Sequence, residues 1–129
     1  MKVLALDFGA ARTGVAVSDP TGTIVRPLCV VERAASENGL AELGLIVREQ
    51  EPELVVVGMP LTLRGERGQQ AQETEAFVEA LRAAVDAPVE TYDERFTTAL
   101  AERSGGEADE DARAAAHLLE SYLERAGRP

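Results

Sequence analysis

The chain has 129 residues, with 13 Lys and Arg against 23 Asp and Glu, and its formal net charge is −10. This length is typical of a single domain (1–129) with its own hydrophobic core, and the acidity argues against broad, non-specific binding of nucleic acid. No apolar run approaches the roughly 20 residues of a membrane span, and the lone cysteine, Cys29, excludes an internal disulfide and fits a reducing cytoplasm.

The first part of the chain predicts three β-strands joined by short turns, over residues 3–7, 15–18 and 24–31. The first run is apolar until Asp7, which is typical of a strand buried on both faces. The turn 10–13 lies between Gly9 and Gly14, and strands joined by so short a turn are expected to pair antiparallel. Pro27 favours an edge position for the third strand.

The rest of the chain alternates helices with strands. Apolar residues at helical spacing predict helices around 40–47, 74–85 and 111–123, and β-branched runs predict strands at 54–57 and 89–92. A short helix is also expected from Thr97 or Thr98 to Arg103. Helical connections favour parallel pairing of the last two strands with the first. The expected fold is α/β, a five-stranded mixed sheet whose first three strands are antiparallel, with helices on both faces.

Acidic residues stand where these elements begin or end. Asp7 ends the first strand, Glu94 follows the fifth, and Asp111 opens the last helix. In the expected sheet these three positions can lie near one another. Asp111 shares a helix face with the apolar Ala115, so its side chain is expected to point toward the sheet, whereas Glu110 is expected in solvent.

Asp7 alone is open to two interpretations, because it could accept backbone donors of the glycine-rich turn or bind a metal. The alternatives for Glu94 and Asp111 are a surface ion pair and a favourable helix N-terminal charge, respectively. Three converging carboxylates, however, cannot all stay ionised without positive charge between them. Mg²⁺ or Mn²⁺ supplies that charge to oxygen ligands, and two such ions about 4 Å apart support phosphodiester hydrolysis. Together the three acids predict a metal-dependent nuclease in which they are catalytic and bind the metal.

Arginines mark the loops near these acids and predict contacts with substrate phosphates. Arg12 projects from the first turn, and Arg64 and Arg67 lie in a glycine-rich loop ahead of a helix N-terminus, which suits a phosphate. The alternative for these three is a solvated surface position. Arg95 either orients its acidic neighbour or contacts substrate. His117 falls on a polar helix face, so a general base of the histidine type is not expected.

Four stretches, in order, resemble the YqgF (RuvX) family of ribonuclease H-like proteins, which is related to the RuvC resolvase: residues 6–19, residues 57–60 with Gly65 beyond, residues 93–98, and residues 111–122. The resemblance covers nearly the whole chain. It implies a ribonuclease H-like fold and a metal-dependent nuclease that matures the 5′ end of the small-subunit ribosomal RNA precursor or cleaves branched DNA. Carried over by position, it implies that Asp7, Glu94 and Asp111 bind the metal.

Two other functions stay open at this point. The Asp7-x-Gly9 turn followed by Gly14 also resembles the phosphate loop of actin-like ATPases and sugar kinases, which need two such domains around a nucleotide. The other is a catalytically silent module that binds nucleic acid or the ribosome. Nucleic acid, as ribosomal RNA precursor or structured DNA, is the expected partner, and a homodimer is one candidate assembly.

Overall fold

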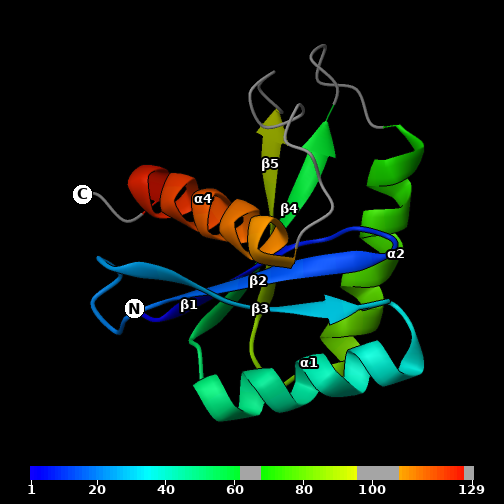
Figure 1. Ribbon diagram of the computed structural model, residues 1–129, viewed down its shortest axis with the longest axis horizontal. Helices are drawn as coiled ribbons and strands as arrows, with labels where there is room; N and C mark the ends of the chain where they lie inside the picture. The colour runs from blue at the N-terminus through cyan, green and yellow to red at the C-terminus, as the bar shows by residue number, and fades with distance from the viewer. Residues whose placement is uncertain (62–67, 96–107, 127–129) are drawn as a thin grey trace.

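A sheet of five strands is the centre of the computed structural model, which describes residues 1–61, 68–95 and 108–126 (Figure 1). Its strands are β1 (Val3–Asp7), β2 (Arg12–Ser18), β3 (Val25–Glu32), β4 (Leu54–Leu61) and β5 (Val89–Arg95). They lie in the order β3-β2-β1-β4-β5. The pairs β1–β2 and β2–β3 are antiparallel, whereas β1–β4 and β4–β5 are parallel. The predicted ribonuclease H-like sheet is therefore confirmed.

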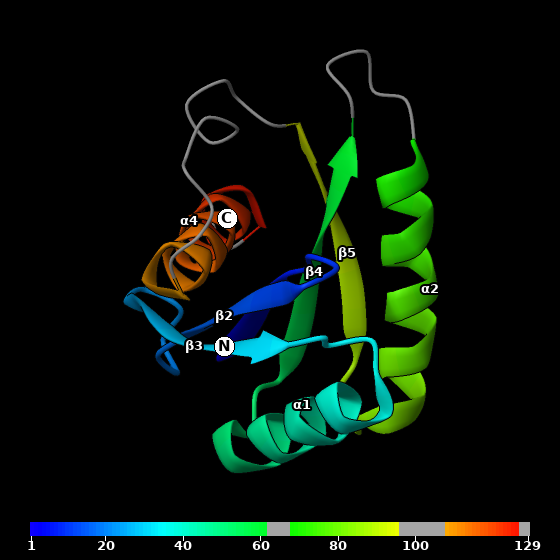
Figure 2. The same ribbon diagram turned by 45° about the vertical axis from the view of Figure 1, so that its right-hand side comes forward.

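Helices cover both faces of this sheet, as predicted. The described helices are α1 (Glu37–Gln50), α2 (Gln69–Ala84) and α4 (Ala108–Ala126). Figure 2 shows α2 and α4 on opposite sides of β4 and β5. The central strand β1 contributes to both cores by alternation, because Leu4 and Leu6 pack with α1 and α2, and Val3 and Ala5 pack with α4. Burial on both faces explains why this strand is apolar until its last residue.

Helix α1 extends about one turn beyond each end of the predicted range 40–47. Ser36 caps its start, since the hydroxyl accepts a hydrogen bond from the N–H of Gly39 at 3.0 Å. The helix ends at Glu51, which adopts the left-handed conformation with φ 51°, one residue before Pro52. Local capping, which apolar spacing does not report, therefore sets both ends.

Strand β2 begins earlier than predicted, at Arg12. Asp7 pairs with Gly14, so the ladder between β1 and β2 extends into the segment expected to form the turn. The predicted turn at 10–13 is therefore wrong in its bounds, and the chain reverses within residues 8–11. The difference matters because it makes Gly14 a residue of the sheet.

Strand β5 is also longer than the predicted range 89–92. It continues through Glu94 to Arg95, in parallel register with the end of β4. The three residues that were expected to follow the strand, 93–95, are therefore part of its backbone ladder. The short helix expected to end at Arg103 lies outside the described residues.

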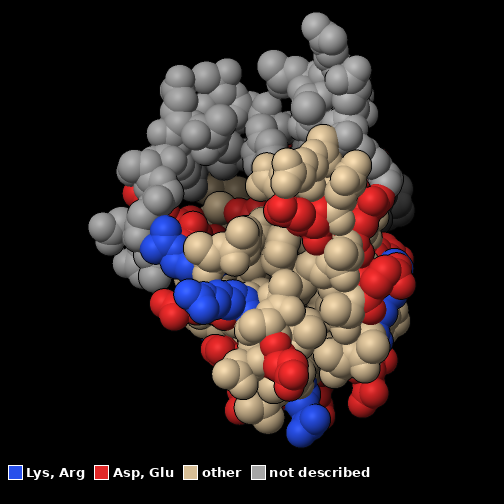
Figure 3. Space-filling model, turned by 90° about the vertical axis from the view of Figure 1, so that its right-hand side faces the viewer, with Lys and Arg blue, Asp and Glu red and all other residues tan. Residues whose placement is uncertain are grey.

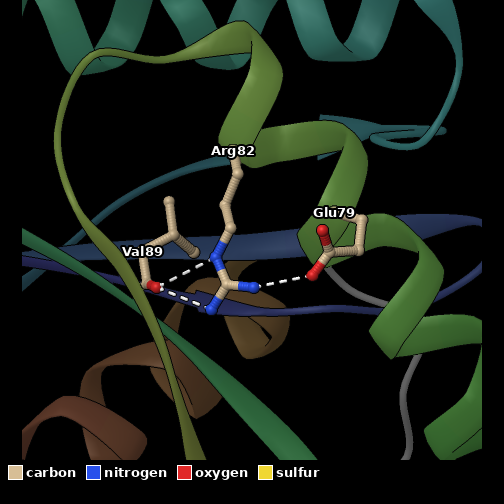
Figure 4. Close-up of polar contacts among 3 residues, drawn as sticks. All are labelled: Glu79, Arg82 and Val89. Carbon is tan, nitrogen blue, oxygen red and sulfur yellow. Dashed lines mark hydrogen bonds and ion pairs between the residues drawn. The ribbon is translucent and has the colours of Figure 1, made fainter.

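Arg82 fixes the end of α2 to the start of β5 (Figure 4). Its Nε and Nη2 atoms donate to the carbonyl oxygen of Val89 at 3.3 and 3.0 Å, and Nη1 lies 2.6 Å from Oε2 of Glu79. The charged guanidinium is thereby held between a helix and a strand. These contacts set the position from which β5 runs toward the candidate site.

The surface is rich in acids on the side that Figure 3 shows, where Lys and Arg gather in smaller groups. Exposed glutamates of α1 and α2 include Glu37, Glu42, Glu49, Glu73 and Glu79. An anionic ligand would be repelled by such a surface. Within the part of the chain that the structure describes, no helix combines the length and apolar character that crossing a membrane requires.

Candidate functional site

Asp7 lies at the carboxyl end of β1, on the face of the sheet that α4 covers. It has the same position in the strand alternation as Val3 and Ala5, which pack against α4. In the antiparallel pair with β2 it lies directly opposite Gly14. Residues paired in this way project to the same face, so the Asp7 carboxyl group has a glycine as its cross-strand neighbour.

Gly14 allows the first turn of α4 to lie directly on β2. A Cβ atom at this position would overlap the carbonyl group of Asp111 and approach the backbone nitrogen of Ala112 to 3.1 Å. Ala112 is itself only 7% exposed. A residue with a side chain would therefore hold the helix away from the strand. The close contact brings Asp111 near Asp7, as their electrostatic interaction also shows.

The environment of Asp7 opposes its ionisation. Burial, followed by the charge of Asp111, raises the pKa of the Asp7 carboxyl group from 3.8 to about 6. In the adjoining turn, the N–H of Gly9 donates to Oγ1 of Thr13 at 3.3 Å, so a threonine and not a carboxylate takes this donor. The raised pKa of Asp7 indicates that its own surroundings do not compensate the ionised carboxylate.

Asp111 has a buried oxygen atom with incomplete partners. Its Oδ2 lies 3.0 Å from Nε of Arg12, an ion pair without hydrogen-bond geometry, and the two side chains are 25% and 33% exposed. The neighbouring Glu110 has a buried Oε2 with no hydrogen-bond partner among the described residues. The expectation that Glu110 is solvated is therefore wrong for this oxygen, since the start of α4 lies so close to the sheet.

The chemistry of these donors fits a hard divalent cation. Asp7 and Asp111 offer neighbouring carboxylate oxygens, one of them buried and without a hydrogen bond, and Mg²⁺ and Mn²⁺ prefer such ligands. The two do not complete a site, because no three His, Cys, Asp or Glu residues gather to hold a metal among the described side chains. A third ligand would have to come from elsewhere, and Glu94 is the predicted one.

Glu94 and Arg95 are described by their backbones alone, at the end of β5. Two residues earlier, Tyr92 packs with the core under α4, and its hydroxyl lies 2.9 Å from Oγ of Ser121. Because strand residues two apart belong to the same face, position 94 belongs to the face of the sheet that carries Asp7. The side-chain roles expected for Glu94 and Arg95 stay predictions.

The remaining predicted residues divide into two groups. Arg64 and Arg67, expected to contact substrate, lie outside the described residues. His117 is exposed on α4, with Nδ1 3.5 Å from Oε1 of Glu120, in agreement with its predicted polar position. The histidine is thus on the solvent side of the helix whose opposite side packs on the sheet.

A hollow of about 320 Å³ lies beside the turn between β1 and β2 and was not predicted from the sequence. Its lining residues come from this turn and from the start of α2: Phe8, Gly9, Ala10, Gln69, Gln70 and Glu73. Phe8 stacks on Phe77 with ring centroids 4.3 Å apart, which fixes one wall. The sequence places an aromatic residue beside the Asp7 turn, but it favours a core position for Phe8, and in the structure Phe8 is partly buried against the core.

Comparison with known proteins identifies relatives over nearly the whole chain. The sequence profile of the family described as RuvX, Holliday junction resolvase, matches residues 1–125. A protein of Chloroflexus aurantiacus named as a candidate pre-16S rRNA nuclease is 40% identical over 131 residues, covering 95% of this chain and 86% of the relative. One of Desulforamulus reducens with the same name is 35% identical over 133 residues, covering 96% of this chain and 97% of the relative.

A solved structure also aligns with most of the chain. It is the Holliday junction resolvase of fowlpox virus, with 12% sequence identity and a TM-score of 0.43, and the match covers 97% of this chain and 77% of that chain. Both values are too low for this comparison to bear on the site or on its chemistry.

Proposed function

The chain belongs to the RuvX family, and from this premise we propose that it is a divalent-metal-dependent nuclease. Its substrates would be phosphodiester bonds of the pre-16S ribosomal RNA, near the 5′ end of the mature molecule, or of branched DNA. The observation that carries the proposal is the contact of Gly14 with the first turn of α4, which brings Asp7 and Asp111 together. We further propose that residues 1–129 act as one nuclease domain in the cytoplasm.

In this proposal Asp7, Glu94 and Asp111 hold Mg²⁺ or Mn²⁺. Asp7 comes from β1, Asp111 from α4 and Glu94 from β5, so the sheet and the helix that crosses it fix the three positions. When bound, the cation would neutralise charge on the scissile phosphate and activate a water molecule. The acids would keep their oxygens in place. The raised pKa of Asp7 supports this assignment, because a nearby cation would favour the ionised carboxylate and so offset the effects of burial and of the Asp111 charge.

Arginines near the acids are proposed to bind the substrate. Arg12 is at the site, 3.0 Å from Asp111, and we assign Arg95, Arg64 and Arg67 to substrate binding on their sequence positions alone. Because the chain carries a net charge of −10, attraction for a phosphate backbone must be confined to this region. The expected salt dependence of binding is correspondingly modest.

The test is a substrate panel of pre-16S RNA fragments and four-way DNA junctions, incubated with Mn²⁺ or with EDTA. We expect Mn²⁺-dependent cleavage by the wild type and none by Asp7→Asn or Asp111→Asn, which keep the volume of the side chain. Asp86→Asn is the matched control, because Asp86 is exposed in the link between α2 and β5.

Cleavage by Asp7→Asn at the wild-type rate would overturn the proposal. Binding without cleavage by any of the proteins, insensitive to both site variants, would instead favour the silent binding module. Circular dichroism of each variant shows that lost activity is not lost folding.

A further inference from the structure

We propose that Arg12 and a divalent cation compete for Asp111, so that cation binding releases the Arg12 side chain to a phosphate of the substrate. This inference rests on the proposed function, because it assumes that Asp111 holds a cation. It adds a coupling between metal binding and substrate binding, and it assigns that coupling to one side chain.

The strand geometry places Arg12 at Asp111. Arg12 opens β2 and precedes Gly14 by two residues, so both residues belong to the face that α4 covers. The guanidinium therefore meets the first turn of the helix at the point where Gly14 lets it approach. Its Nε atom lies 3.0 Å from Oδ2 of Asp111, the buried oxygen that makes no hydrogen bond within the described structure.

The guanidinium of Arg12 places a positive charge at the Asp111 carboxylate, where a metal ion would also bind. Arginine stays protonated in proteins, so it cannot lose its charge when a metal ion approaches. A metal ion bound to the same carboxylate, at the roughly 2.1 Å typical of Mg²⁺, would bring two positive charges to one carboxylate group. The cheaper arrangement moves the arginine, whose side chain is 33% exposed and has solvent to move into.

A released Arg12 would be suited to bind substrate. The planar guanidinium presents several donors in a fork that matches phosphate oxygens, which a lysine ammonium cannot reproduce. It would remain on β2 at the edge of the site, where a phosphate next to the cation would lie. By linkage, a cation that frees Arg12 must raise the affinity for phosphate, and a bound phosphate must raise the affinity for the cation.

The experiment measures cation affinity without any substrate. Mn²⁺ is titrated calorimetrically into the wild type, Arg12→Gln and Arg113→Gln, where Arg113 is exposed on α4 two residues after Asp111 and serves as the matched change in net charge. We expect Arg12→Gln to bind Mn²⁺ more tightly by about threefold to fivefold, in line with a partly exposed ion pair, and Arg113→Gln to stay within about twofold of the wild type.

Arg12→Lys separates competition from phosphate binding and guards against a misfolded Arg12→Gln. It keeps the positive charge, so its Mn²⁺ affinity should stay near that of the wild type. Its affinity for a labelled single-stranded oligonucleotide should fall when measured with Ca²⁺, with the oligonucleotide shown to be intact afterwards. Calcium takes the same kind of oxygen ligands.

The outcomes distinguish the two proposals. If the wild type binds Mn²⁺ and Arg12→Gln binds it equally or more weakly, competition is wrong while the metal-dependent nuclease stands. The same holds if Ca²⁺ raises oligonucleotide affinity equally in the wild type and in Arg12→Lys. If the wild type binds no Mn²⁺, both proposals fail.

Discussion

Replacing Asp7 by asparagine should stabilise the metal-free protein at neutral pH. The Asp7 carboxyl group has a pKa of about 6 in the folded chain, against 3.8 for the ordinary side chain, because it is buried and faces Asp111. A folded-state pKa above the unfolded one means that the native protein binds the proton more tightly. Stability therefore falls as the pH rises from about 4 to about 6, and the loss is complete above this range.

The size of the effect follows from the shift in pKa. The ionised Asp7 costs the folded state about 3 kcal/mol at pH 7.5, roughly half of that at pH 5.0 and less than about 1 kcal/mol at pH 4.0. These values are upper bounds for the gain in Asp7→Asn, because the buried amide brings a desolvation cost of its own. At roughly 3–5 °C per kcal/mol for a chain of this size, the variant should melt up to about 15 °C above the wild type at pH 7.5.

The assay is thermal unfolding followed by circular dichroism in EDTA between pH 4.0 and 8.0. Dilute protein is needed at the acidic end, since the sequence has an isoelectric point of about 4.6. With Mn²⁺ in place of EDTA at pH 7.5, the difference in melting temperature between the two proteins should shift in favour of the wild type. The cation stabilises the wild type by binding to it and has little effect on Asp7→Asn. The same substitution would thus stabilise the metal-free protein and abolish the stabilisation by Mn²⁺.

Asp19 provides a control of opposite sign. The hydroxyl of Thr21, followed by the N–H groups of Ile24 and Thr23, lowers the pKa of Asp19 to about 2. Its contribution to stability is present above pH 3.8 and is lost as the pH falls toward 2. Asp19→Asn should therefore lower the melting temperature at neutral pH.

A loss of stability in Asp7→Asn that is equal at pH 4.0 and pH 7.5 would refute the reasoning about the burial and charge of Asp7.

Three further predictions concern the frame of the site. Gly14→Ala should destabilise the fold by roughly 1–3 kcal/mol and reduce Mn²⁺ binding, because its Cβ would push the first turn of α4 off β2. Gly68→Ala, whose Cβ meets nothing within 4 Å, should leave Mn²⁺ binding unchanged and cost at most about 1 kcal/mol through a poorer N-cap of α2. Arg82→Met should cost about 1–2 kcal/mol in urea unfolding by freeing α2 from β5, whereas Glu79→Gln, which removes only an exposed pairing charge, should cost at most about 0.5 kcal/mol. Tyr92→Phe should cost roughly 0.5–1.5 kcal/mol through the lost hydrogen bond to α4, measured in the same way.

The order of elements and the sheet could be predicted because apolar patterning follows the physics of burial. The run that ends in Asp7 reads as a strand buried on both faces, and the structure confirms it. The helix face on which Asp111 lies could likewise be predicted from its spacing of four residues from Ala115, which is fully buried in the structure. What the sequence could not supply was the register, which decides whether a residue belongs to a turn or to a strand.

Gly14 shows why register matters. In the sequence Gly14 borders a predicted turn, so the conformational freedom of glycine would explain the residue. In the structure Gly14 is paired with Asp7, and glycine is required there because a side chain would collide with α4. The burial of the Glu110 oxygen was missed for a related cause, because helical spacing places a residue around an axis without saying how near the sheet that axis lies.

The position of α4 is thus the variable on which the candidate site depends. Besides the glycine of β2, a second one supports this helix: a Cβ at Gly58 in β4 would come within 3.0 Å of Cδ2 of Leu118. The hydroxyl of Tyr92 in β5 holds a third point through Ser121. These contacts to β2, β4 and β5, two of them made possible by absent side chains, add to the packing of the helix on β1 and β3. A search for acidic residues alone would find the carboxylates in many chains of this composition, whereas their meeting requires small residues at the places where the helix crosses the sheet.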